Sequence, residues 1–437
     1  MSSSTPAPLL DLPALRKSLG HAQLRRASGR VVERVGPIIE AELPGATTGT
    51  LCRIGEDLAE IVGFRSGRAL LMPLDSMDGV RYGAPVECLD TSLSVPVGPD
   101  LIGRVVDGLG EPLDGGASLA HCPRRRVSLQ VPNPMGRALI NEPIVTGVRV
   151  IDGLCTLGRG QRIMIASGSG VGKSTLLGML ARHIDAEIIV ICLVGERGRE
   201  VREFVESNLG PEGLARSVVV VATSDRSPAL QVKAPSVATT IAESFRDQGK
   251  NVLLLVDSLT RLALAQRQIG LAAGEPPTTR GFTPSVFAIL PPLLERAGPG
   301  MGSGSITAIY TVLVEGDDHN DPIADAVRGI VDGHIVLSRD LANRGQYPPV
   351  DVLGSLSRLM SRIAAPEHVG SANNLRRLLA IWRDNEELIR LGAYRAGTDP
   401  DVDHAIAAHG AITTFLQQSP DERTDFETML AALSVVC

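Results

Sequence analysis

The segment RIMIASGSGVGKST, residues 162–175, decides the fold class of this chain. Its first residues are apolar and predict a buried strand that stops at a glycine-rich turn. The residues that follow, LLGMLAR at 176–182, are apolar at helical spacing. A strand, a glycine loop and a helix in this order form a phosphate-binding loop, because backbone N–H groups turn towards a polyphosphate and the helix N-terminus adds its positive dipole. The alternative is a chance glycine turn before a core helix. It does not explain why a predicted strand directly precedes the glycine turn and a predicted helix directly follows it.

The loop and the first turn of the helix have different expected tasks. The residues expected to cradle phosphates with their backbone are Gly168, Ser169, Gly170, Val171 and Gly172. We expect Lys173 to bind the β- and γ-phosphates and Ser174 to hold Mg²⁺. Ser167 is a departure, since the strict motif has glycine at that position.

Composition excludes several classes of protein. The chain has 437 residues, which suggests two to four domains, and its net charge is −6. This charge argues against a broad basic face for nucleic acid, and an aromatic content of 3% is too low for an extended base-stacking platform. The six cysteines are scattered without a C-x-x-C pair, which indicates a reducing compartment.

The sequence shows no targeting or membrane segment. The N-terminus lacks a basic stretch followed by an apolar one, so we expect no signal peptide. No apolar run approaches the roughly 18 residues that a membrane-spanning helix needs. We therefore expect a cytoplasmic protein whose membrane contact is peripheral.

Four regions differ in pattern. Residues 1–28 carry leucines beside basic residues and suggest a partner-binding or membrane-surface helix, with a frayed tail as the alternative. Residues 29–96 contain short strands with frequent turn signals, which predicts a small β-barrel. Residues 97–362 alternate apolar strands with helices, and residues 363–437 contain only helical patterns.

The third region predicts an α/β domain. Its apolar strand candidates are 162–166, 188–194, 218–222, 252–256, 306–314 and 335–337. Continuous apolar strands separated by helices indicate a parallel sheet covered on both faces. The phosphate-binding loop then lies at the carboxyl ends of the strands, where such sheets bind ligands. In the last region we expect amphipathic helices over 375–388 and 402–416.

Two carboxylates follow predicted strands and are candidates for nucleotide hydrolysis. Asp257 ends the run LLLVD, which suits a Walker B acid that supports the Mg²⁺ shell. Glu196 follows the strand over 188–194 and could polarise the attacking water, although a salt-bridged loop with Arg197 and its neighbours is the alternative.

Two further residues are more ambiguous. Tyr347 precedes two prolines and could stack on adenine, or serve a structural purpose. Arg358 is far in sequence from the loop and fits a finger-type arginine, but most arginines are simply solvated.

Four longer stretches resemble the signatures of the protein-export ATPases of type III secretion systems and flagella, which are relatives of the catalytic subunit of rotary ATP synthases. They are GERGREVREF at 195–204, GLAAGEPP at 270–277, YTVLVEGDD at 310–318 and DGHIVLSR at 332–339. The resemblance runs from about residue 29 to about residue 430. The stretch ATSDRS at 222–227 favours the secretion-system branch over the flagellar one.

The resemblance implies a RecA-like P-loop ATPase core, an N-terminal β-barrel and a C-terminal helical domain. It implies a homohexamer that binds ATP and Mg²⁺ between neighbouring subunits. It also implies that Thr175 contacts the phosphates together with Lys173 and Ser174. The implied function is ATP hydrolysis that powers type III secretion, with chaperone release and unfolding of cargo at the inner-membrane export gate. The implied partners are a stator-like regulator, a central stalk protein, the export-gate protein and chaperone–effector complexes, at the cytoplasmic face of the bacterial inner membrane.

The resemblance also assigns catalytic roles. It implies that Glu196 is the catalytic carboxylate and that Arg197 and Arg261 support the site. Tyr347 would flank adenine, and Arg358 would reach into the neighbouring subunit's site.

Alternatives and departures remain. A flagellar export ATPase is the near alternative, whereas an ATP synthase β-type subunit should carry an acidic torque motif that is not found here. An RNA-translocating hexamer is disfavoured by charge and aromatic content, and a non-catalytic ring subunit should lack Glu196. Relatives more often have Ala or Gly at Ser167, and Arg and Pro at Thr279 and Thr283, so we expect this last loop to move or contact partners differently.

Overall fold

The computed structural model describes residues 27–75, 77, 79–89, 93–314 and 321–436. They belong to two compact units that divide between Ser92 and Leu93. Almost all of the expected N-terminal segment, residues 1–28, lies outside the described residues. The domain boundaries expected from the sequence, at residues 96 and 362, therefore stay proposals.

The first unit is a closed β-barrel with strand order β1-β2-β5-β4-β3-β6, in which β6 pairs back with β1. Its strands are β1 (Ser28–Val35), β2 (Ile38–Glu42), β3 (Leu51–Ile54), β4 (Asp57–Arg65), β5 (Arg68–Pro73) and β6 (Pro85–Leu89). The register shifts in β1 after Val31 and in β4 after Ile61, and such bulges bend strands so that a short sheet can close. Ile39, Leu71 and Val86 face the apolar interior, and the expected barrel is confirmed.

The second unit is built on a sheet of nine described strands, with the order β19-β18-β12-β17-β15-β13-β14-β8 and β16 paired with β17. They are β8 (Val105–Asp107), β12 (Arg162–Ser167), β13 (Ile188–Val194), β14 (Ser217–Ala222), β15 (Asn251–Asp257), β16 (Gly298–Pro299), β17 (Ser305–Leu313), β18 (Gly333–Leu337) and β19 (Leu356–Ser357). Along this order, the pairs from β18 through to β8 are parallel, whereas β16 pairs antiparallel with β17 and β19 pairs antiparallel with β18. The predicted α/β core is thus confirmed, and the short edge strand β8 is an addition to it.

Helices cover both faces of this sheet, as the complete burial of β13 requires. The helical segments between strands are α2 (Arg149–Leu154), α3 (Lys173–His183), α4 (Gly198–Glu203), the π-helix η3 (Phe204–Leu209), α5 (Gly210–Leu214), α6 (Pro228–Arg246), α7 (Leu259–Ala273), η4 (Thr279–Gly281), α8 (Pro284–Leu294), α9 (Pro322–Ile330) and α10 (Arg339–Asn343). Alternate residues of β13, such as Ile189 and Ile191, join the core cluster that contains α3. Helix α6 packs along β13, β14 and β15.

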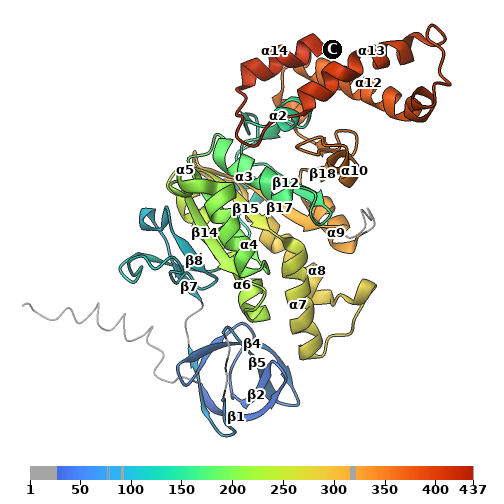
Figure 1. Cartoon of the computed structure of the whole chain (residues 1–437). Helices are drawn as coiled ribbons and strands as arrows, with labels where there is room; N and C mark the ends of the chain where they lie inside the picture. Colours follow the sequence, from blue (N-terminus) through green and yellow to red (C-terminus); the bar gives the residue numbers. More distant parts are fainter. Residues whose placement is uncertain (1–26, 76, 78, 90–92, 315–320, 437) are drawn as a thin grey trace, which may run out of the picture. The chain divides into compact units, whose positions relative to one another are not determined.

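Three helices end the chain: α12 (Pro366–Arg390), α13 (Pro400–Leu416) and α14 (Phe426–Val436), preceded by α11 (Met360–Ile363). Figure 1 shows them gathered at one end of the second unit, beside α2. They share a continuous apolar core with the sheet domain. Arg376 on α12 donates from Nη2 to the Leu154 carbonyl (2.5 Å) and from Nη1 to the Ser355 carbonyl (3.2 Å). The predicted helical region at the C-terminal end is confirmed, but α14 was not predicted from the sequence.

The remaining elements are short. They are β7 (Ser94–Pro96) paired with β9 (Arg124–Arg126), β10 (Pro143–Ile144) paired with β11 (Leu157–Gly158), and the 3₁₀ turns η1 (Pro99–Leu101) and η2 (Pro134–Gly136). Within the described ranges, every helix is too short or too polar to cross a membrane.

Candidate active site

The glycine loop joins the carboxyl end of β12 to the start of α3. Gly170 and Gly172 have φ angles of 75° and 100°, a region that side chains rarely adopt. Helix α3 begins at Lys173, so the N–H groups of its first turn have no partners within the helix. The loop and this turn line a pocket of about 390 Å³, which is large enough for a polyphosphate.

The pocket collects most of the residues expected from the sequence. Those expected are Gly168, Ser169, Gly170, Gly172, Lys173, Ser174, Thr175, Glu196, Arg197, Asp257 and Arg261. Those not expected are Leu193, Glu200, Val201, Glu203, Phe204, Asn208 and Leu313. They come from the ends of β12, β13, β15 and β17 and from the helical segments after β12, β13 and β15, which meet at the same edge of the parallel sheet.

Lys173 lies between the two predicted carboxylates. Its Nζ forms an ion pair with Asp257 and lies 3.7 Å from Oε1 of Glu196. Asp257 also accepts a hydrogen bond of 2.7 Å from the Thr311 hydroxyl. All of these side chains are largely buried, so the cation and both acids are fixed in a place shielded from water.

The environment of Glu196 favours its protonated form. Burial raises the pKa of Glu196 to about 7, and a hydrogen bond to Glu200 and the charge of Asp257 add to the rise, while Lys173 and Arg261 oppose it. The pKa of Glu200 falls correspondingly, chiefly through its hydrogen bond with Glu196. A carboxylate poised near neutral pH is suited to exchanging a proton with a reacting water.

Two arginines line the pocket in different ways. Arg261 on α7 packs against Gly195, where a Cβ atom would lie 2.9 Å from the arginine Cβ and where φ is 66°. Its Nε is buried and has no hydrogen-bond partner among the described residues. Arg197 is exposed and pairs with Glu200 at 3.1 Å.

Three expected residues lie outside the pocket lining. Val171 is buried in the core beneath the loop. Tyr347 is 49% exposed, and its ring lies 3.8 Å from where a Cβ on Gly172 would be, so it borders the loop. Arg358 is exposed after β19, and its Nη2 donates to the Arg328 carbonyl at 3.3 Å. The structure thus does not bring Arg358 into the pocket of its own chain.

Ser167, Thr279 and Thr283, which depart from the family pattern, all lie within the described residues. The Ser167 hydroxyl is buried at the end of β12 and has no hydrogen-bond partner among the described residues. Thr283 is buried, and its Oγ1 lies 3.1 Å from the hydroxyl of Ser285. Thr279 begins η4. The expected change in movement or partner contacts of this loop stays a prediction.

Two contacts at the site were not predicted from the sequence. Thr311 bonds Asp257 from the neighbouring strand β17, and Arg339 donates from Nη2 to the Ser169 carbonyl at 3.1 Å. Strand β17 also carries Ser305, Thr307 and Tyr310, so its pattern of residues does not single out Thr311. Arg339 ends the stretch 332–339 that carries part of the family resemblance, but no role was expected for it.

Comparison with known proteins gives consistent matches. Residues 147–357 match the ATP synthase alpha/beta family, nucleotide-binding domain, and residues 364–435 match the T3SS EscN ATPase C-terminal domain. The chain is 52% identical to the type 3 secretion system ATPase of Xanthomonas euvesicatoria over 98% of both proteins. It is also 52% identical to the flagellum-specific ATP synthase of Bacillus subtilis, over 93% of this chain and 94% of the relative.

Solved structures agree. The assembled ATPase EscN from the type III secretion system of enteropathogenic E. coli superposes with a TM-score of 0.89 at 45% identity, covering 93% of this chain and 99% of that one. EscN in complex with its central stalk EscO superposes with a TM-score of 0.86, at the same identity and coverage.

Proposed function

Because this chain belongs to the ATP synthase alpha/beta family and, within it, to the ATPases of type III secretion and flagellar export, we propose that it hydrolyses ATP at the glycine loop and thereby powers type III protein secretion. The observation that carries the proposal is the convergence of Lys173, Glu196 and Asp257 at the phosphate-binding loop. A nucleotide-binding loop alone would bind ATP without hydrolysing it, whereas the added carboxylates supply the groups that hydrolysis needs.

The residues of the pocket have different proposed roles in phosphoryl transfer. The loop amides and Lys173 bind the phosphates, and Lys173 exchanges its ion pair with Asp257 for the incoming anion. Glu196 orients the attacking water and accepts its proton. Arg261 and Arg197 both line the pocket and stabilise phosphate charge there. Tyr347 borders the loop where an adenine ring would stack.

The donor set also fits Mg²⁺. The hydroxyl of Ser174 and the carboxylate of Asp257 both line the pocket and are oxygen ligands, which Mg²⁺ prefers. Once Lys173 turns to the phosphates, the buried Asp257 needs another cation nearby. Bound there, Mg²⁺ would neutralise charge on the β- and γ-phosphate oxygens.

The proposed working form is a homohexamer with nucleotide sites at the subunit interfaces. Arg358 lies outside the pocket of its own chain and is exposed, which is what an arginine acting on a neighbour requires. The relative EscN has been solved in an assembled form and with its central stalk EscO, and we propose a stalk protein as a partner here. A stator-like regulator, an export-gate protein and chaperone–effector complexes are further proposed partners.

We place the protein in the cytoplasm, peripheral to the inner membrane, where it would release chaperones and unfold cargo at the export gate. A flagellar export ATPase is the second candidate, because a flagellum-specific relative is as identical to the chain as a type 3 secretion relative is. The secretion-system relative matches over more of both chains, and the C-terminal helices match the EscN family model, which favours the first proposal.

Replacing Lys173 by Ala should weaken ATP binding about 10- to 100-fold, since charge-assisted hydrogen bonds contribute about 1.5–3 kcal/mol each. The measurement is titration with a fluorescent ATP analogue in the presence of Mg²⁺. Lys250→Ala, which removes an exposed lysine paired with Glu187, is the matched control and should bind normally. Equal affinity of the Lys173 variant and the wild type would contradict the proposed site.

The pH dependence of hydrolysis should follow the titration of Glu196. Because the reaction needs the carboxylate and the pKa is raised to about 7, kcat/KM should rise with pH through about 7 and fall about tenfold per unit below it. Glu200→Gln removes the anionic partner that raises this pKa, so its acid limb should shift to lower pH. Glu206→Gln, an exposed change on the next helical segment, η3, should leave the limb in place. If Glu200→Gln leaves the acid limb of the pH profile unchanged, a group other than Glu196 titrates there.

A further inference from the structure

A cluster of three side chains lies away from the nucleotide pocket, at the start of the second unit. Strands β7 and β9 pair antiparallel, with Pro96 opposite Arg124, and the Val97 N–H donates to the Pro123 carbonyl at 2.8 Å. This ladder brings the turn η1, which carries Asp100, beside the loop before β9, which carries His121 and Cys122. The two segments are thus held together by backbone hydrogen bonds.

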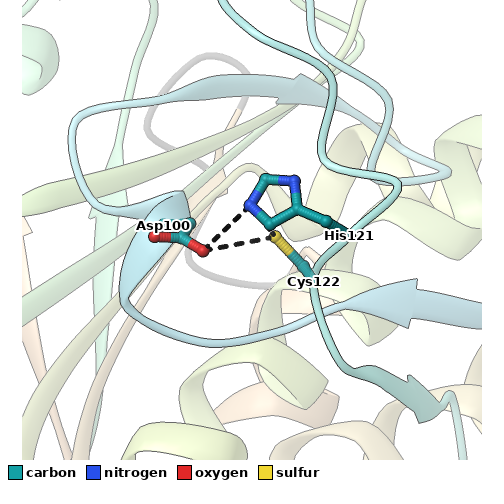
Figure 2. Close-up of side chains that lie close together, drawn as sticks. All are labelled: Asp100, His121 and Cys122. Carbon is teal, nitrogen blue, oxygen red and sulfur yellow. Dashed lines mark hydrogen bonds and ion pairs between the residues drawn. The ribbon is translucent and has the colours of Figure 1, made fainter.

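The polar atoms of these three residues converge, as Figure 2 shows. Oδ2 of Asp100 lies 3.2 Å from Nε2 of His121 and 3.8 Å from Sγ of Cys122. The same His121 nitrogen and the Cys122 sulfur are 3.9 Å apart. In the described residues, this is the group of His, Cys and carboxylate side chains whose ligand atoms lie close enough to share a metal ion.

The triangle has the dimensions of one face of a tetrahedral zinc site. Zinc lies about 2.0 Å from carboxylate oxygen, about 2.05 Å from histidine nitrogen and about 2.3 Å from thiolate sulfur. Tetrahedral angles then give ligand–ligand separations of about 3.3 Å for O–N, about 3.5 Å for O–S and about 3.6 Å for N–S. Each measured separation differs from these by only about 0.1–0.4 Å, which small side-chain rotations can close. We propose that Asp100, His121 and Cys122 form a Zn²⁺ site.

The surroundings match this ion. The side chains of Asp100 and His121 are 58% and 64% exposed, whereas Cys122 is buried, so the ion can enter from solvent and keep a water in the fourth position. A thiolate and a carboxylate balance the two positive charges. The nearby cation, Arg104, is already bound through Nε and Nη2 to Asp114, both at 2.8 Å, so it does not hold the cluster's carboxylate.

The ligand set also separates this site from the nucleotide pocket. Sulfur and imidazole ligands select Zn²⁺ over Mg²⁺, which prefers oxygen. Zinc binding would join η1 to the loop before β9 and stabilise the folded form of this edge by mass action. The site depends on none of the residues proposed for ATP hydrolysis.

The test is a zinc titration of the full chain with excess Mg²⁺ present, read with a chromophoric zinc chelator as competitor. We expect one equivalent of Zn²⁺ per chain with micromolar or tighter affinity. Co²⁺ in place of Zn²⁺ should give a thiolate-to-metal charge-transfer band. Asp100→Asn, His121→Ala and Cys122→Ser should each weaken binding at least about tenfold, the smallest loss seen even for outer-shell partners, and Cys122→Ser should abolish the band.

His404→Ala, which removes an exposed histidine on α13, is the control and should bind zinc like the wild type. Thermal unfolding of the metal-free proteins checks that each variant is folded. Because Asp100 and His121 are exposed, their variants decide the question even where Cys122→Ser is unstable. Absence of a stoichiometric site, or undiminished binding by the folded Asp100 and His121 variants, would overturn the proposal.

Discussion

Replacing Glu196 by Gln is expected to preserve ATP binding and to lower steady-state hydrolysis by a factor on the order of 10² or more. The substitution keeps the size of the side chain and removes the group that accepts a proton from water. ATP binding should persist because Lys173 and the loop amides are untouched, and because one negative charge fewer faces the phosphates. The measurement pairs phosphate release with nucleotide affinity on the same preparation.

Glu206→Gln provides the matched control, since Glu206 is exposed and pairs with Arg202 on the surface. It should hydrolyse ATP at the wild-type rate. Hydrolysis by the Glu196 variant at close to the wild-type rate would remove Glu196 from the mechanism. Loss of ATP binding in that variant would instead mean that the carboxylate organises the pocket.

Replacing Arg358 by Ala is expected to lower hydrolysis about 10³-fold or more while ATP still binds, because an arginine supplied by a second subunit contributes at this scale. Arg358 does not line the described pocket of its own chain, and its Nη2 donates to the Arg328 carbonyl there. Activity should therefore depend on assembly. Arg362→Ala, an exposed arginine one turn further along, should have little effect.

Mixing two inactive variants distinguishes an arginine that acts in trans from one that acts in its own chain. Lys173→Ala damages its own pocket but still offers Arg358 to a neighbour. Mixed rings of Lys173→Ala and Arg358→Ala subunits should recover part of the activity, because some interfaces combine an intact pocket with an intact arginine. Mixed rings that form, as shown by co-purification of two tags, yet stay as inactive as either parent would refute the trans assignment.

The sequence predicts the central sheet well because its strands are buried on both faces. Runs such as 188–194 are apolar without interruption and flanked by turns. It misses β8, a strand of only three residues that ends in Asp107 and pairs with β14 at the edge of the sheet. It also starts α12 too late, because the first turns, from Pro366, carry few apolar residues and are held by tertiary contacts such as the 2.8 Å hydrogen bond from His368 to the Gly153 carbonyl.

The site was predictable to the extent that its residues follow strands. Glu196 follows β13 and Asp257 is the last residue of β15, and parallel strands bring their carboxyl ends to one edge. Arg261 lies on α7 without a local signal and was expected only from the family resemblance. Thr311 was missed because a hydrogen bond between adjacent strands depends on register, which the pattern of apolar residues does not specify.

Whether ATP hydrolysis by this chain powers type III secretion is tested most directly in the cell that the chain comes from. The native gene is replaced by the Glu196→Gln form, and proteins exported by the type III apparatus are quantified in the medium, alongside motility. We expect that secretion is lost while the protein is present at its normal level and motility is retained. Undiminished secretion, or loss of motility with secretion intact, would contradict it.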